Sequence, residues 1–168
     1  MSAAVSADPP DDPAHPPTLE VVRIPSHGLK MNGIIVKAAG VAQHPVVLLS
    51  YGLPGKEQSL DVARAIRRDG WSVLTSHDRG CWGNPGTYSF THVFEYSLAV
   101  MDLARDPTVV PRYGLDTSRI VVVGHSLAGM AASIVGRDDP ELERVIILGG
   151  GVIGISIAYP ITHEPPPI

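Results

Sequence analysis

The chain has 168 residues, of which 44% are hydrophobic and 18% charged, and this composition indicates a globular domain, neither disordered nor fibrous. Its formal net charge of -4 comes from acids and bases scattered along the sequence, without the basic patch that binds nucleic acid or an anionic membrane. The single cysteine, Cys81, excludes an internal disulfide framework.

The two ends of the sequence are rich in proline. Residues 1–17 also carry acids and lack the apolar core of a secretory signal, so we predict a disordered tail there and a cytoplasmic location. The apolar stretch at 145–159 is rich in glycine and shorter than the ~20 residues that cross a bilayer. We therefore expect a folded domain over 18–158, a second proline-rich tail over 159–168, and no nucleic-acid or membrane partner.

The predicted elements begin with two β-branched runs, 18–24 and 31–37, whose polar connection is typical of a β-hairpin. The run VVLLS at 46–50 is short and continuously apolar, as in a strand that is buried on both faces. Apolar residues at helical spacing predict a helix over 57–69, and the run WSVLTS predicts the next strand over 71–76.

The rest of the chain continues to alternate. Glycines and a proline exclude regular structure from 77–90, and Thr91 is expected to cap a helix over 91–105. Three more elements follow: a strand at 119–123, a helix of small residues at 126–135 and a strand at 144–148. This alternation predicts an α/β fold, with a mostly parallel sheet and helices on both faces.

A G-x-S-x-G pattern, Gly124-His125-Ser126-Leu127-Ala128-Gly129, lies between a predicted strand and a predicted helix, which is the context of a nucleophile elbow. Such a turn strains the backbone at the serine, and side chains in place of the flanking glycines would collide. The turn lifts the hydroxyl above the sheet and aims the first helix amides at it, which favours developing negative charge. Ser126 is therefore the candidate nucleophile; an inert serine in a glycine-rich turn is the alternative. His125 is expected to be structural.

Four stretches in chain order resemble the α/β-hydrolase superfamily, in particular esterases and serine aminopeptidases: the strand ending in YGLPG, then DRGCWGNPG, RYGLDTSRI and GHSLAG. The resemblance extends from about Thr18 to Leu148. It implies that Ser126 is the nucleophile and that the oxyanion hole consists of the N–H groups of Leu127 and Leu53. It also implies a small-molecule ester or amide substrate, and we expect no cofactor and no metal.

Two positions within these stretches need comment. The family usually has His-Gly where this chain has Tyr51-Gly52, so the hydrogen bonding of that histidine is expected to be lost. The segment Asp78-Arg79-Gly80 fits a loop that is structural in the family, and we expect a loop salt bridge there.

The catalytic partners of the serine are not evident. A serine hydroxyl needs a base that an acid orients, in the chain order Ser, Asp or Glu, His. The only histidine after Ser126 is His163, in the proline-rich tail. The acids that follow the serine are Asp138, Asp139, Glu141, Glu143 and Glu164, and the first four are expected at the opposite end of the sheet. We predict an incomplete α/β-hydrolase fold: a truncated serine hydrolase that acts on ester or amide bonds by acyl transfer to water, with an inactive chain as one alternative.

Two further alternatives concern function and partners. The chain could be a non-catalytic pseudo-hydrolase that serves as a binding module. Residues 149–154, GGGVIG, also satisfy G-x-G-x-x-G and with their surroundings resemble the first βα turn of FAD-dependent oxidoreductases of the D-amino-acid oxidase type, so a hydrolase fragment fused to the start of an oxidoreductase is the third hypothesis. An exposed sheet edge is expected where further strands should follow, and it could pair two copies into a homodimer.

Overall fold

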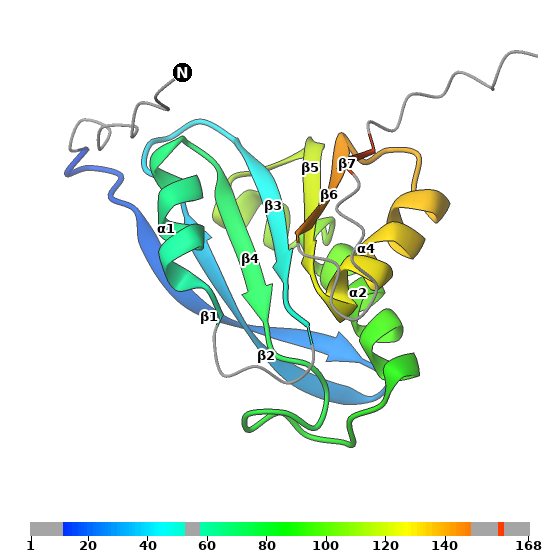
Figure 1. Cartoon of the computed structure of the whole chain (residues 1–168). Coiled ribbons are helices and arrows are strands. Elements are labelled where there is room, and N and C mark those ends of the chain that lie inside the picture. Colours follow the sequence, from blue (N-terminus) through cyan, green and yellow to red (C-terminus); the bar gives the residue numbers. More distant parts are fainter. Residues whose placement is uncertain (1–11, 53–57, 149–157, 160–168) are drawn as a thin grey trace, which may run out of the picture.

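The computed structural model describes residues 12–52, 58–148 and 158–159, which form one twisted sheet with helices packed on both of its faces (Figure 1). The strands are β1 (Thr18–Ser26), β2 (Leu29–Lys37), β3 (His44–Ser50), β4 (Ser72–Ser76), β5 (Leu115–His125), β6 (Arg144–Leu148) and β7 (Ala158–Tyr159). The helices are α1 (Leu60–Arg68), α2 (Phe90–Ala104), α3 (Val109–Tyr113) and α4 (Leu127–Asp138).

The strand order in the sheet is β1-β2-β4-β3-β5-β6-β7. The four central strands, β4, β3, β5 and β6, run parallel to one another. The hairpin of β1 and β2 joins β4 in antiparallel fashion, and β7 pairs antiparallel with β6. Because the central strands are parallel, the loops that follow them meet at one edge of the sheet, where ligands bind in open α/β sheets.

Strand β3 shows how the sheet separates two apolar layers. Val46 and Leu48 lie in the larger cluster, together with residues of α2 and α4. Val47 and Leu49 lie in the smaller cluster, with Ala63 of α1. Successive side chains of a strand point to opposite faces, so the continuously apolar run predicted for this segment is explained by burial on both sides.

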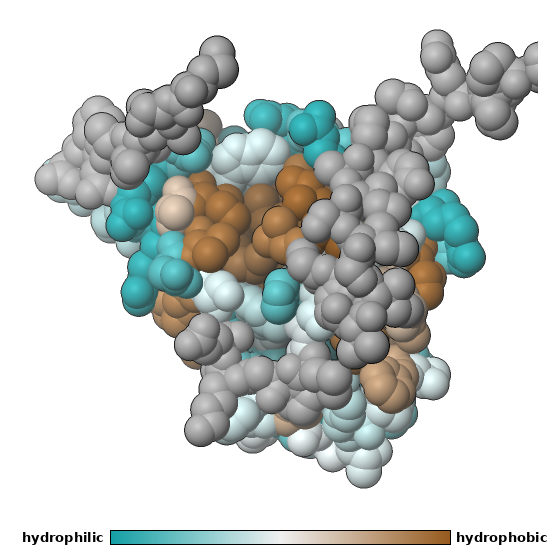
Figure 2. Space-filling view, in the orientation of Figure 1, coloured by the Kyte–Doolittle hydropathy of each residue, from teal (hydrophilic) through white to brown (hydrophobic). Residues whose placement is uncertain are grey.

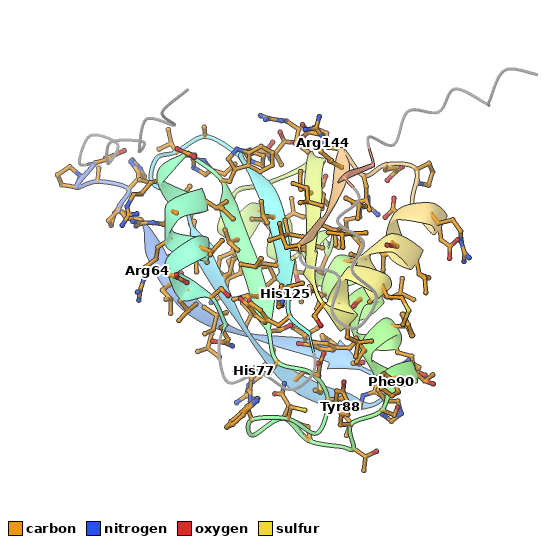
Figure 3. The ribbon with its side chains drawn as sticks, in the orientation of Figure 1. Arg64, His77, Tyr88, Phe90, His125 and Arg144 are labelled. Atoms are coloured by element: carbon orange, nitrogen blue, oxygen red, sulfur yellow. The ribbon has the colours of Figure 1, made fainter. Side chains whose placement is uncertain are left out.

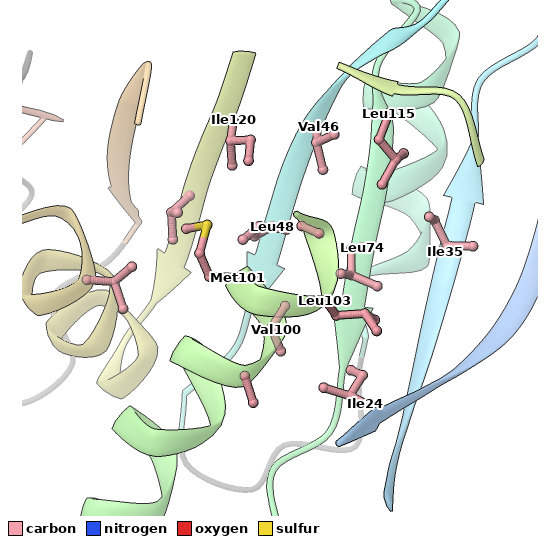
Figure 4. Packing of buried hydrophobic residues seen from close by; sticks show 14 of the residues in the cluster. Ile24, Ile35, Val46, Leu48, Leu74, Val100, Met101, Leu103, Leu115 and Ile120 are labelled. Atoms are coloured by element: carbon pink, nitrogen blue, oxygen red, sulfur yellow. The ribbon is translucent and has the colours of Figure 1, made fainter. Parts of the chain in front are cut away.

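The larger cluster is the main core. Apolar residues of α2 pack against the strands at its centre, where Val100, Met101 and Leu103 face Leu48 and Leu74 (Figure 4). On the opposite face, α1 leaves part of the sheet uncovered, and Figure 2 shows an apolar area beside that helix. The two faces of the sheet are thus covered unequally by the described residues.

The structure confirms the predicted fold class and nearly all of the predicted elements, with some shifted ends. The cap of α2 is Ser89, whose side chain accepts a hydrogen bond from the N–H of His92, so the predicted cap at Thr91 was wrong. Helix α3 was not predicted, although Gly114 ends it in the left-handed conformation. Strand β5 begins at Leu115, four residues before its predicted start.

The segment after β6 differs from the sequence prediction. The resemblance to a βα turn implies a helix after GGGVIG, but Ala158 and Tyr159 form β7 beside β6. Strand β6 therefore has a neighbour at its outer edge, and the homodimer through that edge stays a prediction. The GGGVIG segment at 149–154 lies outside the described residues, as do His163, Glu164 and Leu53. The limits of the tails and of the domain also stay predictions.

Candidate active site

Ser126 lies in a sharp turn between β5, which ends at His125, and α4, which begins at Leu127. Its backbone angles are φ 55° and ψ -120°, a conformation that side chains disfavour. Such strain costs about 1–3 kcal/mol and persists only where the surroundings impose it. Here the Ser126 N–H donates to the Leu148 carbonyl (3.2 Å), and the Ser126 carbonyl accepts from the Gly129 N–H (3.0 Å). Strand β6 and helix α4 therefore both hold the turn.

Three glycines make room for the turn. A β-carbon at Gly124 would lie 2.3 Å from the Ala128 carbonyl oxygen, and one at Gly129 would lie 2.7 Å from the Ile147 side chain. A β-carbon at Gly52, in the loop after β3, would lie 2.4 Å from the Ser126 β-carbon. The first two contacts explain the glycines of the G-x-S-x-G pattern, and the third places the β3 loop directly against the serine.

The Ser126 side chain lies at the start of α4 and is partly open to solvent. The residue is half-buried, so its hydroxyl is not enclosed in the core. The Leu127 N–H is the first amide of α4, and among the described residues no backbone carbonyl accepts a hydrogen bond from it. That amide and the positive end of the helix dipole are available to an anion at the elbow. Leu53, the second predicted donor, lies outside the described part of the chain.

A pocket opens beside the elbow at the carboxyl ends of the strands. Its lining comes from the loop after β3, the loop after β4, one side of α2 and the start of α4. The lining residues are Ser50, Tyr51, Gly52, Ser76, His77, Asp78, Cys81, Trp82, Val93, Tyr96, Ser97 and Ala128. Gly52 and Ala128 are the lining residues that also contact the elbow, so the pocket borders the candidate nucleophile.

The polar side chains of the pocket have shifted acidities. Burial raises the pKa of the Asp78 carboxyl to about 6 and lowers the pKa of the His77 imidazole. Burial, with a smaller contribution from the Asp78 charge, also raises the pKa of the Cys81 thiol. At neutral pH the pocket therefore contains an ionised Asp78, a neutral imidazole and a protonated thiol, which is not the state of a reactive cysteine.

Arg79 makes the salt bridge that the sequence predicted in this loop, and its partner lies on α2. Its guanidinium is buried, pairs with Glu95 at 3.0 Å and donates to the Ser26 hydroxyl at 2.7 Å. These contacts join the β4 loop to α2 and to the end of β1. Asp78, the sequence neighbour of Arg79, takes no part in them.

A buried amide fastens the same loop to the N-terminal hairpin. The side chain of Asn84 accepts a hydrogen bond from the Asn32 N–H of β2 at 2.7 Å and donates one to the His77 carbonyl at 2.6 Å. Two side chains, Arg79 and Asn84, thus hold the pocket wall that follows β4.

Tyr51 replaces the histidine expected in the β3 loop and makes a contact of its own. The Thr75 hydroxyl of β4 donates to the Tyr51 hydroxyl at 3.2 Å. Burial raises the pKa of the Tyr51 phenol, so it is neutral at physiological pH. This hydrogen bond links the loop after β3 to the neighbouring strand β4.

The first four acids that follow the serine lie away from it, at the opposite end of the sheet, as the sequence predicted. Asp139 pairs with Arg105, and Glu143 approaches Arg119 to 3.6 Å. Asp138 pairs with the adjacent Arg137. These acids are thus engaged in structural ion pairs.

No catalytic base is evident within the described ranges. No hydrogen bond joins the Ser126 hydroxyl to another side chain there, and His125 is exposed. Figure 3 places His77 with Tyr88 and Phe90 in the lower part of the view, beyond the strand ends. No group of three metal-ligating side chains occurs in the described part of the chain. Its helices also include none long and apolar enough to cross a membrane.

Part of the pocket escaped the sequence reasoning. Ser126 and Leu127 were predicted as site residues, but the roles of Asp78, Trp82 and Tyr96 as pocket walls were not. The available signal was the position of Asp78 just after a parallel strand, at the edge where ligands bind in such sheets.

Comparison with solved structures identifies the fold as that of the α/β hydrolases. The α/β hydrolase GrgF from Penicillium sp. sh18 matches with a TM-score of 0.68 and 16% identity over 79% of this chain and 46% of that one. The esterase Est22 matches with a TM-score of 0.66 and 14% identity, over 77% of this chain and 42% of that one. Est1E from Butyrivibrio proteoclasticus, solved with ferulic acid, matches with a TM-score of 0.64 and 18% identity, over 74% and 51%.

These likenesses establish the fold and leave the activity to be tested. The chain spans about half the length of the solved structures it matches. No family model matches the sequence, and no curated protein matches it.

Proposed function

We propose that the protein is a serine hydrolase that acts on ester or amide bonds of small molecules, with Ser126 as its nucleophile. The observation that carries this proposal is the strained turn at Ser126, with φ 55°, between a buried strand and a helix. A serine in an ordinary connection would adopt a relaxed conformation, and strain of this kind gathers at functional sites.

The chemistry follows from the geometry of the turn. The Ser126 oxygen attacks the substrate carbonyl, and the negative charge that develops on the carbonyl oxygen is stabilised by the Leu127 N–H and the α4 dipole. The Leu53 N–H is the proposed second donor. The bond to the alcohol or amine of the substrate then breaks, and this leaving group departs with the proton that the serine has lost. Water next hydrolyses the acyl-serine to the free acid and regenerates the Ser126 hydroxyl. The solved structures with this fold include esterases, which supports the same class of reaction.

A fluorophosphonate probe tests the nucleophile directly. Ser126 should displace fluoride from the probe, forming a bond from its oxygen to phosphorus with loss of a proton, and become labelled. Ser126→Ala should abolish labelling, and Ser133→Ala is the matched control because Ser133 lies on the exposed side of the same helix. Equal labelling of wild type and Ser126→Ala would remove Ser126 from the mechanism.

A second candidate is a binding module without catalysis. The specific observation in its favour is that no described side chain forms a hydrogen bond with the Ser126 hydroxyl to act as a base. Purified protein would then bind ester analogues without turnover. Hydrolysis of a p-nitrophenyl ester above background that disappears in Ser126→Ala would reject this candidate.

A further inference from the structure

We propose that the pocket beside Ser126 selects substrates that carry a protonated amine close to the scissile carbonyl, with Asp78 as the counter-charge and Tyr96 as a second polar contact. This inference rests on the proposed function, because it names the class of ester or amide that the serine would attack.

The first observation is that the Asp78 carboxylate has no cationic partner among the described residues. Arg79, next to Asp78, is directed to Glu95 and Ser26. None of the other described Lys, Arg or His side chains lies within ion-pair distance of the Asp78 carboxylate. A half-buried carboxylate that opens into a pocket next to a nucleophile is a group prepared for a cationic ligand.

The second observation is independent of charge. The Tyr96 side chain lines the same pocket and is only 3% exposed, yet its hydroxyl has no hydrogen-bond partner among the described residues. Ser76 is close enough to influence the hydroxyl but does not form a well-oriented hydrogen bond with it. An unpaired buried hydroxyl costs about 1–3 kcal/mol, and a polar group of a ligand would remove that cost.

Charge favours an amine over a neutral donor. Among the described lining residues, Asp78 is the only charged group at neutral pH, since burial lowers the pKa of His77 and raises the pKa of Cys81. A ligand hydroxyl would satisfy one lone pair of the carboxylate but leave its charge uncompensated. An ammonium group compensates the charge, and two aromatic residues, Trp82 and Tyr96, line the same pocket. Aromatic rings attract cations that approach their faces.

The position of Asp78 limits the size of the substrate. Asp78 follows β4 and Ser126 follows β5, with β3 between these two strands. Neighbouring strands are about 4.8 Å apart, so the two backbones are separated by roughly 10 Å, and both side chains shorten the gap. That spacing suits a small amino-acyl group better than a long chain.

The test uses two fluorophosphonates of equal chain length, one ending in a primary amine and the other in a methyl group. Wild type should be labelled at least about tenfold faster by the amine probe, which corresponds to one charge-assisted contact. Asp78→Asn should react equally with both probes. Asp102→Asn, an exposed acid of α2, should keep the wild-type preference.

A second variant separates recognition from structure. Tyr96→Phe should lower the preference for the amine probe by a few-fold without lowering the melting temperature, because the lost hydroxyl has no partner in the protein. A clear fall in melting temperature would assign the hydroxyl a structural role and overturn its part in the proposal.

The outcomes distinguish the two proposals. Equal labelling of wild type by both probes would overturn the amine preference and leave the serine hydrolase standing. If neither probe labels Ser126, the proposed function fails. The preference of the pocket for an amine is then tested by ligand binding alone. In that case n-butylamine should shift the Trp82 indole resonance in wild type and not in Asp78→Asn, whereas n-butanol should have no effect; equal shifts by both ligands would overturn it.

Discussion

The two walls of the pocket are built in different ways. On the side of β5 and α4, the glycines at 52, 124 and 129 allow close approach, because a β-carbon at each would meet the Ser126 side chain, the Ala128 carbonyl and the Ile147 side chain in turn. On the side of β4, the loop is held by the side chains of Arg79 and Asn84. The first wall presents the Ser126 hydroxyl, and the second presents the Asp78 carboxylate.

This difference separates reactivity from selectivity. Contacts this close tolerate almost no added atom, so the position of Ser126 is fixed by the packing of the strands and α4. Contacts made by side chains can be exchanged one at a time, so the wall that meets the substrate can be altered while the sheet is kept. The comparison predicts that substitutions in the first wall affect folding and labelling together, and that substitutions in the second can separate them.

Gly124→Ala should have the largest effect. Its β-carbon would lie 2.3 Å from the Ala128 carbonyl oxygen, which is backbone and has nowhere to move. We expect a loss of about 3 kcal/mol in the free energy of unfolding, measured by urea denaturation, and loss of fluorophosphonate labelling. Gly70→Ala is the control, since its site is open and only its φ of +84° is unfavourable, with a cost of about 1 kcal/mol. Equal losses in the two variants would contradict the close contact.

Arg79→Met should come second. It leaves Glu95 with only the exposed His27 imidazole, 3.5 Å away, and Ser26 without its donor, and the expected loss is about 2 kcal/mol because Glu95 is partly exposed. Arg137→Met, which removes a fully exposed ion pair, should leave the urea midpoint unchanged. A midpoint for Arg79→Met that matched wild type would show that other contacts hold the β4 loop.

Asp78→Asn should change the free energy of unfolding least of the three variants, and it should increase it. Because burial raises the pKa of Asp78 to about 6, the unfolded chain ionises before the folded one as pH rises from about 4. Stability therefore falls between about pH 4 and pH 6, and the penalty is constant above that range. The neighbours that sense this charge, Cys81, Tyr88 and Tyr96, remain neutral there.

The variant should accordingly be more stable than wild type by about 1–2 kcal/mol at pH 7.5, and the gain should vanish near pH 4. Thermal melts at the two pH values measure it, with Asp102→Asn as the matched control. If Asp78→Asn were more stable than wild type by the same amount at both pH values, the gain would not come from removing a buried negative charge. Greater stability together with lost amine preference would indicate that the charge is kept for binding.

The parts of the molecule that could be predicted are those fixed by local constraints. The apolar run of β3 and the glycines around Ser126 each follow from short-range geometry, and the structure confirms the strand and the strand-turn-helix context. Helix α3 was missed because its five residues contain a proline and too few apolar positions to show a period. The cap of α2 was placed at Thr91 because Ser89 and Thr91 are both good capping residues, and the sequence does not reveal which N–H groups the helix leaves unpaired.

The pocket could not be predicted in the same way, since it depends on contacts between distant segments. Asp78 and Arg79 are adjacent, which suggests a local ion pair, but the partner of Arg79 is Glu95, sixteen residues further along the chain. The unpaired hydroxyl of Tyr96 becomes visible only when α2 is placed on the sheet. A pattern within one segment predicts a turn, whereas a pocket requires the relative placement of four segments.

The hydrogen bond from the Asn32 N–H to the Asn84 side chain connects the N-terminal hairpin to the pocket loop that follows β4. Because the hairpin lies outside the parallel strands, its replacement would leave the attacking group untouched. It would, however, shift the loop that bears the carboxylate and so change the width of the opening through which a substrate enters. Exchange of β1 and β2 between proteins of this fold is therefore expected to change substrate selectivity while the position of Ser126 stays the same.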